Sequence, residues 1–199
     1  MAQVSSRPIL LFDVMSTLVY DPFYVELPAH FGMTFEEMLA CKHPDAWERF
    51  ETGEWDEAVF LPNFFKDGRS YDHAAFKSTL AAGFRWLDGM LELTTQLKRA
   101  GFKLHALSNY PPWYQLIEER LSLSRVLDGA FVSFELGVRK PADDAYLIPA
   151  QRLGVEAGAC LFIDDQDANC RAARGLGMDA ILFQDSTQLR AELSARDLI

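Results

Sequence analysis

The sequence predicts an α/β fold in which helices cover a parallel sheet and a helical segment is inserted after the first strand. Three observations support this prediction. A short apolar run, Ile9–Phe12, is typical of a buried strand. Residues 21–85 contain helix-like segments and no convincing strand. From Leu87 onward, strand-like and helix-like segments alternate, as they do in parallel βαβ units.

The insertion separates two parts of one predicted core. Thr34 and Glu37 have the spacing of a helix capping box, and Gly53 and Gly68 are expected to end helices. Helices are expected at residues 22–31, 34–41, 44–52, 55–65, 71–84, 90–100, 112–121, 143–153, 168–176 and 187–193, and the later strands at 103–108, 129–133, 159–164 and 180–183. We therefore expect a core domain at residues 1–20 and 86–199 and a helical cap domain at residues 21–85.

The composition restricts the possible partners. The chain has 199 residues, which suits one domain with a small insertion, and its 49% hydrophobic content is too high for a disordered chain. The net charge is −10, and no Lys/Arg cluster is longer than Arg139-Lys140, which argues against nucleic-acid binding. Apolar runs are far shorter than the roughly 20 residues of a membrane span. We expect a monomer or a homodimer that binds neither nucleic acid nor membranes.

The first residues carry the prediction of compartment. Met1–Pro8 contain one Arg and no apolar or amphipathic leader. This pattern indicates a cytoplasmic protein. A protein of the plastid stroma would have the same pattern after removal of its transit peptide, so that alternative stays open.

Polar residues follow the predicted strands at the point where each strand ends. Asp13 follows the first strand, Ser108-Asn109 the second and Asp164-Asp165 the fourth, and Lys140 lies in the loop after the third. A lone Asp at such a position also serves as a helix cap or turn residue. Because the carboxyl ends of parallel strands share one edge, however, these groups should converge. Carboxylates held together need a cation, and carboxylate oxygens suit Mg²⁺, which points to phosphoryl chemistry.

With these motifs the chain resembles the haloacid dehalogenase (HAD) superfamily of aspartate-nucleophile hydrolases. Its four motifs match Phe12–Leu18, Ser108-Asn109, Lys140-Pro141 and Phe162–Asp165, in the expected order. The resemblance implies a three-layer Rossmann-like core with a small helical cap of type C1. It also implies a Mg²⁺-dependent phosphatase that cleaves a small phosphorylated metabolite, a phosphomonoester, through an aspartyl-phosphate intermediate on Asp13.

The resemblance also assigns roles to single residues. Asp13 would be the nucleophile and a Mg²⁺ ligand, and Met15 would offer its backbone carbonyl to the metal. Asp165 would be the second carboxylate ligand, with Asp164 beside it as a further ligand or a support. Asn169 would help to hold this metal loop.

The phosphoryl group would be bound from the other side by three residues. Ser108 would donate a hydrogen bond to it, Asn109 would support the same loop, and Lys140 would neutralise both Asp13 and the phosphate. These roles too follow from the resemblance.

Residue 15 departs from the family pattern. HAD phosphatases usually carry a second Asp two residues after the nucleophile, which protonates the leaving oxygen and later activates water. Met15 cannot move a proton, and such help is worth about 10²–10⁴-fold. Two alternatives follow: a metal-independent 2-haloacid dehalogenase-like enzyme, which needs no such acid, or a catalytically impaired protein that binds a phosphorylated ligand or a partner. The pair Asp164-Asp165 argues for a metal and so against the first.

A narrower resemblance concerns the substrate. Several stretches are similar to the plant chloroplast group of HAD proteins that includes flavin mononucleotide hydrolase. That group has Asp where this chain has Ser16. The similar stretches are Phe12–Met15, Asp21–Tyr24, Phe31–Met33, Cys41–Pro44, Asn63–Arg69, Leu87–Met90 and Asn109–Tyr114. The resemblance makes flavin mononucleotide the leading candidate substrate.

Five further residues are candidates for substrate binding, each with a structural alternative. Trp113 and Tyr114 could stack on a flavin ring, or pack at a helix start. Lys66 and Arg69 could contact a phosphate or ribityl chain, or face solvent. His43 could supply the missing proton transfer, or cap a cap-domain helix.

Overall fold

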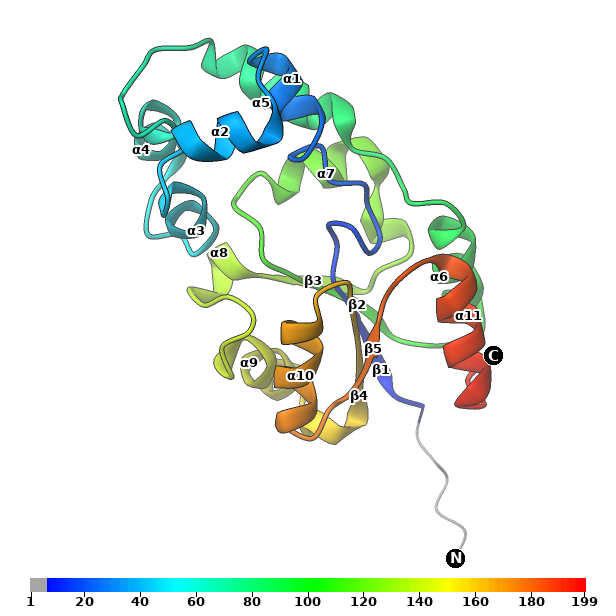
Figure 1. Cartoon of the computed structure of the whole chain (residues 1–199). Coiled ribbons are helices and arrows are strands. Elements are labelled where there is room, and N and C mark those ends of the chain that lie inside the picture. Colours follow the sequence, from blue (N-terminus) through cyan, green and yellow to red (C-terminus); the bar gives the residue numbers. More distant parts are fainter. Residues whose placement is uncertain (1–6) are drawn as a thin grey trace, which may run out of the picture.

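The core is a five-stranded parallel sheet. The computed structural model describes residues 7–199, so residues 1–6, on which the prediction of compartment rests, lie outside it. The strands are β1 (Ile9–Phe12), β2 (Leu104–Ser108), β3 (Gly129–Val132), β4 (Cys160–Asp164) and β5 (Asp179–Leu182). Their spatial order is β3-β2-β1-β4-β5, with β1 at the centre (Figure 1). The predicted α/β fold class is confirmed.

Helices cover both faces of the sheet. The helices after the insertion are α6 (Met90–Arg99), α7 (Tyr114–Leu121), α8 (Ser133–Leu136), α9 (Asp144–Leu153), α10 (Asp167–Gly175) and α11 (Ser186–Ala195). Along β1, Leu10 packs in one hydrophobic cluster with residues of α6 and α11, whereas Leu11 packs in a second cluster with residues of α9 and α10. A strand buried on both faces explains the continuous apolar run in the sequence, and it gives the three-layer arrangement.

The inserted segment forms a group of short helices above the carboxyl edge of the sheet (Figure 1). It comprises α1 (Glu26–His30), α2 (Phe35–Cys41), α3 (Ala46–Glu51), α4 (Glu57–Phe60), the 3₁₀ turn η1 (Leu61–Asn63) and α5 (His73–Gly83). The capping box of Thr34 and Glu37 is confirmed, with both of its hydrogen bonds present. Aromatic side chains form the interior of this cap, as in the stacked pair Phe50 and Phe60, whose ring centroids are 4.3 Å apart.

The two connecting segments between core and cap run side by side. The backbone amide of Tyr20 donates to the carbonyl of Arg85 at 2.8 Å, and that of Leu87 donates to Leu18 at 2.9 Å. The division into domains at residues 20/21 and 85/86 stays a prediction, and these hydrogen bonds hold the two connections together where it places the boundary.

Two local details differ from the prediction. Residues 22–25 are turns and not helix, because the Asp21 side chain accepts the amide of Phe23 and forms an Asx turn. After β3, the residues from Ser133 form the short helix α8, where the sequence suggested strand and loop; α8 ends at Gly137, whose φ is 70°. No helix within residues 7–199 is long and apolar enough to cross a membrane.

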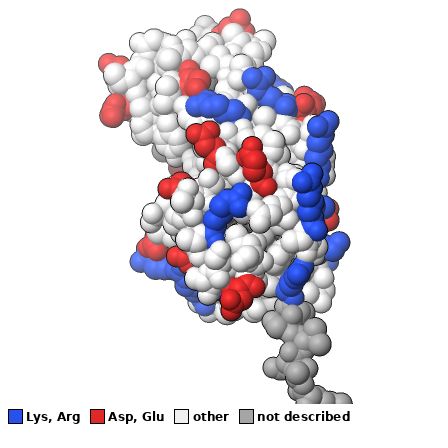
Figure 2. Space-filling view, turned by 90° about the vertical axis from the view of Figure 1, so that its right-hand side faces the viewer, with Lys and Arg blue, Asp and Glu red and all other residues white. Residues whose placement is uncertain are grey.

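The surface carries charges of both signs. In the face that Figure 2 shows, Lys and Arg side chains are interspersed with Asp and Glu side chains and separated by uncharged residues. The net charge of −10 is therefore not gathered into one acidic field on this face.

Candidate active site

Asp13 and Lys140 form the centre of the site at the carboxyl edge of the sheet. Asp13 directly follows the central strand β1, and Lys140 reaches it from the loop after α8. The buried Lys140 Nζ donates to Asp13 Oδ1, to Asp164 Oδ2 and to the carbonyl of Leu107, each at 2.7 Å. All three protons of the ammonium group thus have an acceptor, and the Asp13 carboxylate is fixed in orientation.

The charges in this cluster do not cancel. Burial raises the pKa of Asp13, Lys140 lowers it, and the neighbouring Asp164 and Asp165 raise it again. Burial alone would lower the pKa of Lys140, but the two carboxylates that it contacts raise it above its usual value. One ammonium group therefore faces three carboxyl groups, and the cluster favours an additional cation.

The two consecutive aspartates after β4 point in different directions. Asp164 is fully buried, where its Oδ1 accepts the backbone amide of Gln166 at 2.7 Å and both of its oxygens accept Asn169 Nδ2 at 3.1 Å. Asp165 instead lines the open cavity beside Asp13. Asp164 therefore holds Lys140 and the loop in place, and Asp165 is the carboxylate offered to a ligand.

The side chains of Ser108 and Asn109 have separate tasks. Asn109 makes two hydrogen bonds with the backbone of Lys140: its Nδ2 donates to the Lys140 carbonyl at 2.9 Å, and its Oδ1 accepts the Lys140 amide at 2.8 Å. It thereby ties the loop of Lys140 to the end of β2. The buried Ser108 Oγ has no hydrogen-bond partner in the described part of the chain. A buried hydroxyl without a partner is costly, so this group is available to a ligand.

The segment after Asp13 forms a tight loop that shapes the cavity floor. The carbonyl of Val14 accepts the amides of Leu18 and Val19 at 2.9 and 2.8 Å, and Ser16 takes a left-handed backbone conformation with φ of 60°. Within residues 7–199, no hydrogen-bond donor to the carbonyl of Met15 is found.

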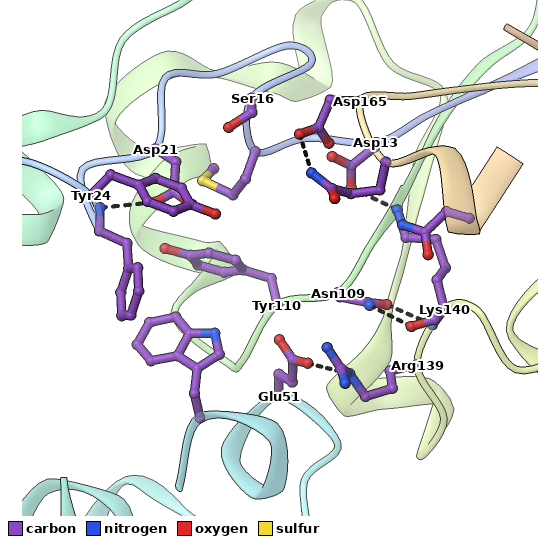
Figure 3. Close-up of a pocket in the computed structure, with 15 residues that line it drawn as sticks. Asp13, Ser16, Asp21, Tyr24, Glu51, Asn109, Tyr110, Arg139, Lys140 and Asp165 are labelled. Atoms are coloured by element: carbon purple, nitrogen blue, oxygen red, sulfur yellow. Dashed lines mark hydrogen bonds and ion pairs between the residues drawn. The ribbon is translucent and has the colours of Figure 1, made fainter. Parts of the chain in front are cut away.

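Cap and core together enclose a cavity of about 280 Å³ next to Asp13 (Figure 3). Its floor is polar and comes from the core loops. The far wall is rich in aromatic side chains. The core contributes Asp13, Met15, Ser16, Asn109, Tyr110, Arg139, Lys140, Asp165, Gln166 and Asn169, and the segment after the first strand contributes Asp21, Phe23, Tyr24, Trp47 and Glu51.

The sequence that forms this site matches the model of a known family. The family model of haloacid dehalogenase-like hydrolases matches residues 9–177. The chain belongs to this family. Over 187 residues it is 46% identical to flavin mononucleotide hydrolase 1 of Arabidopsis thaliana, whose name marks it as chloroplastic; the match covers 94% of this chain and 76% of that protein.

More distant relatives agree. The chain is 27% identical over 169 residues to the sesquiterpene phosphatase astK of Aspergillus oryzae, which covers 81% of this chain and 84% of that one. A HAD enzyme of Bacteroides thetaiotaomicron, solved in complex with magnesium and inorganic phosphate, has the same fold with a TM-score of 0.77 at 18% identity, covering 92% of this chain and 99% of that chain. The protein is a HAD-superfamily phosphatase.

The residues of this HAD phosphatase fit a Mg²⁺ ion. No cluster of three or more His, Cys, Asp or Glu side chains with metal-binding spacing exists within residues 7–199. Mg²⁺ needs less than that, because it is commonly held by one or two carboxylates together with waters and substrate phosphates. Asp13 and Asp165 face one cavity, the Met15 carbonyl lacks a donor, and the local charge is negative.

Five residues predicted as candidates for substrate binding are absent from the lining of this cavity. Trp113 is buried in the aromatic interior that joins cap and α7, with its ring 5.0 Å from Phe50, and it donates from Nε1 to Glu57. The structure thus supports the packing alternative for Trp113. Tyr114, its neighbour, begins α7 and is likewise absent from the cavity lining.

The cap residues Lys66, Arg69 and His43 also do not reach the cavity. Lys66 is exposed, and Arg69 is held by a two-pronged ion pair with Asp67. His43 Nδ1 accepts the backbone amide of Asp45 at 3.2 Å. Lys66 thus faces solvent, Arg69 pairs with a neighbour in the cap, and His43 makes a local contact just before α3.

Sequence reasoning missed most of the cavity wall. Asp21, Tyr24, Trp47, Glu51 and Arg139 line the cavity, but the sequence analysis assigned them no role. For three of them a signal was available: Asp21 and Tyr24 lie in a stretch that is similar to the chloroplast group, and Arg139 directly precedes Lys140. The others depend on how the cap lies over the core, which no local pattern reveals.

Proposed function

We propose that this protein is a Mg²⁺-dependent phosphatase that hydrolyses flavin mononucleotide through an aspartyl-phosphate on Asp13. One observation carries the proposal: the same cavity joins a phosphoryl-handling floor, Asp13, Lys140 and Asp165, to an aromatic wall. The name of the Arabidopsis relative supports the substrate.

The aromatic wall fits a planar ring system. Phe23, Tyr24, Trp47 and Tyr110 line it, with the Phe23 and Trp47 centroids 5.4 Å apart and those of Trp47 and Tyr110 6.1 Å apart. The Tyr24 side chain is an unusually exposed aromatic, with 51% of its surface accessible. Aromatic side chains stack favourably on flat conjugated rings. Since about 280 Å³ lies just below the usual range for ligand pockets, we expect the phosphate end to be enclosed and the ring to extend past Tyr24.

In the proposed reaction, the residues of this chain do the following. Lys140 holds the Asp13 carboxylate toward the phosphorus and neutralises charge on the phosphoryl oxygens, and Ser108 donates a hydrogen bond to one of them. An Asp13 oxygen forms a bond to phosphorus while the bond to the ribityl oxygen breaks. Water then attacks the phosphorus, inorganic phosphate leaves and Asp13 is restored. Asp13, Asp165 and the Met15 carbonyl would hold Mg²⁺, which supplies charge stabilisation when it is bound.

The direct test is phosphate release from flavin mononucleotide with Mg²⁺ and with EDTA. We expect metal-dependent release, and a lower kcat/KM for glycerol 3-phosphate, which has no ring. Chloride release from a 2-haloacid in EDTA would support the dehalogenase alternative instead. Binding of flavin mononucleotide without any turnover would support the catalytically impaired alternative.

Tyr24→Ala tests the aromatic wall. We expect it to raise KM for flavin mononucleotide about 3–10-fold, the equivalent of one stacking contact, and to leave glycerol 3-phosphate kinetics nearly unchanged. Because Tyr24 is largely exposed, the variant should fold normally. The matched control is Val25→Ala, the next residue, which is 61% exposed and does not line the cavity. Equal losses for both substrates would contradict a ring-binding role.

The relative's name also bears on the compartment. Of the two locations that the sequence left open, we propose the plastid stroma, because the relative with 46% identity is named chloroplastic. Imaging of the full-length gene product fused to a fluorescent protein tests this.

The oligomeric state, monomer or homodimer, stays a prediction. Size-exclusion chromatography with light scattering measures it.

A further inference from the structure

The cavity contains two carboxyl groups that the reaction above does not use. Met15 leaves the reaction without the acid–base group that the family usually has two residues after the nucleophile. Besides Asp13 and Asp165, the cavity is lined by the carboxyl groups of Asp21 and Glu51. Either could in principle supply the proton, so their surroundings decide between them.

Glu51 already has a dedicated cation. Its buried carboxylate, at the end of α3, lies 2.5 Å from Arg139 Nε, and Arg139 Nη1 also contacts Glu48 at 3.0 Å. This pair links the cap helix to the loop that carries Lys140. Burial raises the pKa of Glu51 to about 7 although Arg139 lowers it, so pKa does not separate Glu51 from Asp21. The ion pair with Arg139 separates them, because it uses the Glu51 side chain to connect α3 to the Lys140 loop.

Asp21 has no such partner. Its Oδ1 accepts the amide of Phe23 at 2.9 Å, and in the described part of the chain no Lys, Arg or His forms an ion pair with it. Burial raises the pKa of Asp21 to about 6, the Phe23 amide lowers it, and the charges of Asp165 and Glu26 raise it. The other titratable groups beside it are the phenols of Tyr24 and Tyr110. Asp21 is half-buried, and placing a carboxyl group there without a cation costs stability, which indicates a functional reason for its presence.

The position of Asp21 suits the missing task. Figure 3 shows Asp21 beside Tyr24, across the cavity from Asp13 and Lys140. In phosphoryl transfer the attacking and leaving oxygens are roughly in line, so a phosphoryl group attacked by Asp13 directs its leaving oxygen toward the far wall. Water that later attacks the phosphorus enters from the same side, and one group can therefore serve both steps.

We propose that Asp21 is the general acid and base of this phosphatase, in place of residue 15. The inference rests on the proposed phosphatase reaction. In the first step the Asp21 carboxyl gives its proton to the leaving alkoxide as the bond from phosphorus to that oxygen breaks. In the second step the Asp21 carboxylate takes a proton from the attacking water as the bond from phosphorus to Asp13 breaks, which restores both side chains.

The test compares Asp21→Asn with the wild type on two esters. Asn keeps an oxygen for the Phe23 amide but cannot transfer a proton. The ribityl alcohol of flavin mononucleotide needs protonation to leave, whereas the nitrophenolate of p-nitrophenyl phosphate does not. We expect kcat/KM for flavin mononucleotide to fall about 10²–10³-fold and that for p-nitrophenyl phosphate to fall less than about tenfold.

Stability gives a second measurement on the same variant. In metal-free protein we expect Asp21→Asn to raise the urea midpoint above that of the wild type at pH 7.5. Because the folded pKa of Asp21, about 6, exceeds its ordinary value of 3.8, the wild type loses stability as pH rises through this interval, and the difference should vanish near pH 4. A midpoint lowered by Asp21→Asn at pH 7.5 would indicate a structural carboxylate and overturn the proposal.

The outcomes separate the two proposals. Wild-type protein that hydrolyses neither ester overturns the phosphatase proposal and this one with it. Wild-type protein active on both, with equal losses in Asp21→Asn, overturns only the role of Asp21. The matched variant is Glu51→Gln, for which we expect the two esters to lose the same factor. A selective loss of activity on flavin mononucleotide in Glu51→Gln would indicate that Glu51, at the end of α3, is the general acid instead of Asp21.

Discussion

Replacing Asp13 with Asn is expected to abolish phosphate release, with a loss of at least about 10⁴-fold in kcat, because an amide cannot attack phosphorus. The fold should persist. Asn is nearly the same size, its carbonyl oxygen can still accept from Lys140, and the variant removes one of the carboxyl groups that repel each other at this site. Phosphate release in saturating Mg²⁺ measures activity, and circular dichroism with urea unfolding measures the fold.

The matched control is Asp144→Asn, an exposed Asp in the first turn of α9 far from the cavity lining. It should leave activity unchanged. Activity of Asp13→Asn above the background of the assay would rule out Asp13 as the nucleophile. Loss of folding in that variant would show that the charge of Asp13 is needed to balance Lys140.

The strand ends could be predicted because their pattern is local. Asp13, Ser108 and Asp164 each end an apolar run, and a parallel sheet places such positions at one edge whatever the rest of the chain does. The same argument placed Lys140 at this edge, because it lies in the loop that follows one of the later predicted strands. The clamp that Asn109 makes on the backbone of Lys140 shows why these two motifs belong together.

The cavity wall could not be predicted in this way. Trp113 lies five residues after Ser108, and this closeness in sequence favoured a place in the site. Trp113 directly precedes α7, and its ring packs in the aromatic interior of the cap. Trp47 is far away in sequence but reaches the cavity, because α3 lies over the sheet edge. Which of two aromatic residues meets a ligand thus depends on the packing of cap on core, which involves contacts distant in sequence.

The different roles of Asp164 and Asp165 likewise depend on contacts between segments that are distant in sequence. In the sequence they are equivalent neighbours at the end of β4. Successive side chains of a strand alternate in direction, so one turns to Lys140 and Asn169 and the other to the cavity. The alternation was predictable, but which residue faces the cavity depends on the register of β4 against β1, in which Phe12 pairs with Ile163.

Replacing Lys140 with Met is expected to have the largest effect on stability. The ammonium group is buried and lies 2.7 Å from both Asp13 and Asp164, so its removal leaves two buried carboxyl groups facing each other without a cation. Removing one partner of a buried ion pair costs about 3–5 kcal/mol. For a chain of this length that corresponds to a fall of roughly 6–20 °C in Tm. Activity should also fall by more than about 10²-fold, since nothing then orients Asp13 or neutralises the phosphoryl oxygens.

A double variant separates charge from packing in this prediction. In Asp13→Asn/Lys140→Met, one of the two carboxylates that lack a cation is also removed. The double variant should therefore lose less stability than the sum of the two single changes, by roughly 0.5–3 kcal/mol. Urea unfolding of the four proteins in EDTA measures this coupling. The control is Lys103→Met, whose side chain is 69% exposed and 3.8 Å from Asp128, and which should change stability by well under 1 kcal/mol. Additive losses would mean that Lys140 stabilises the fold by filling space, and that the carboxylates around it need no ammonium group to remain buried.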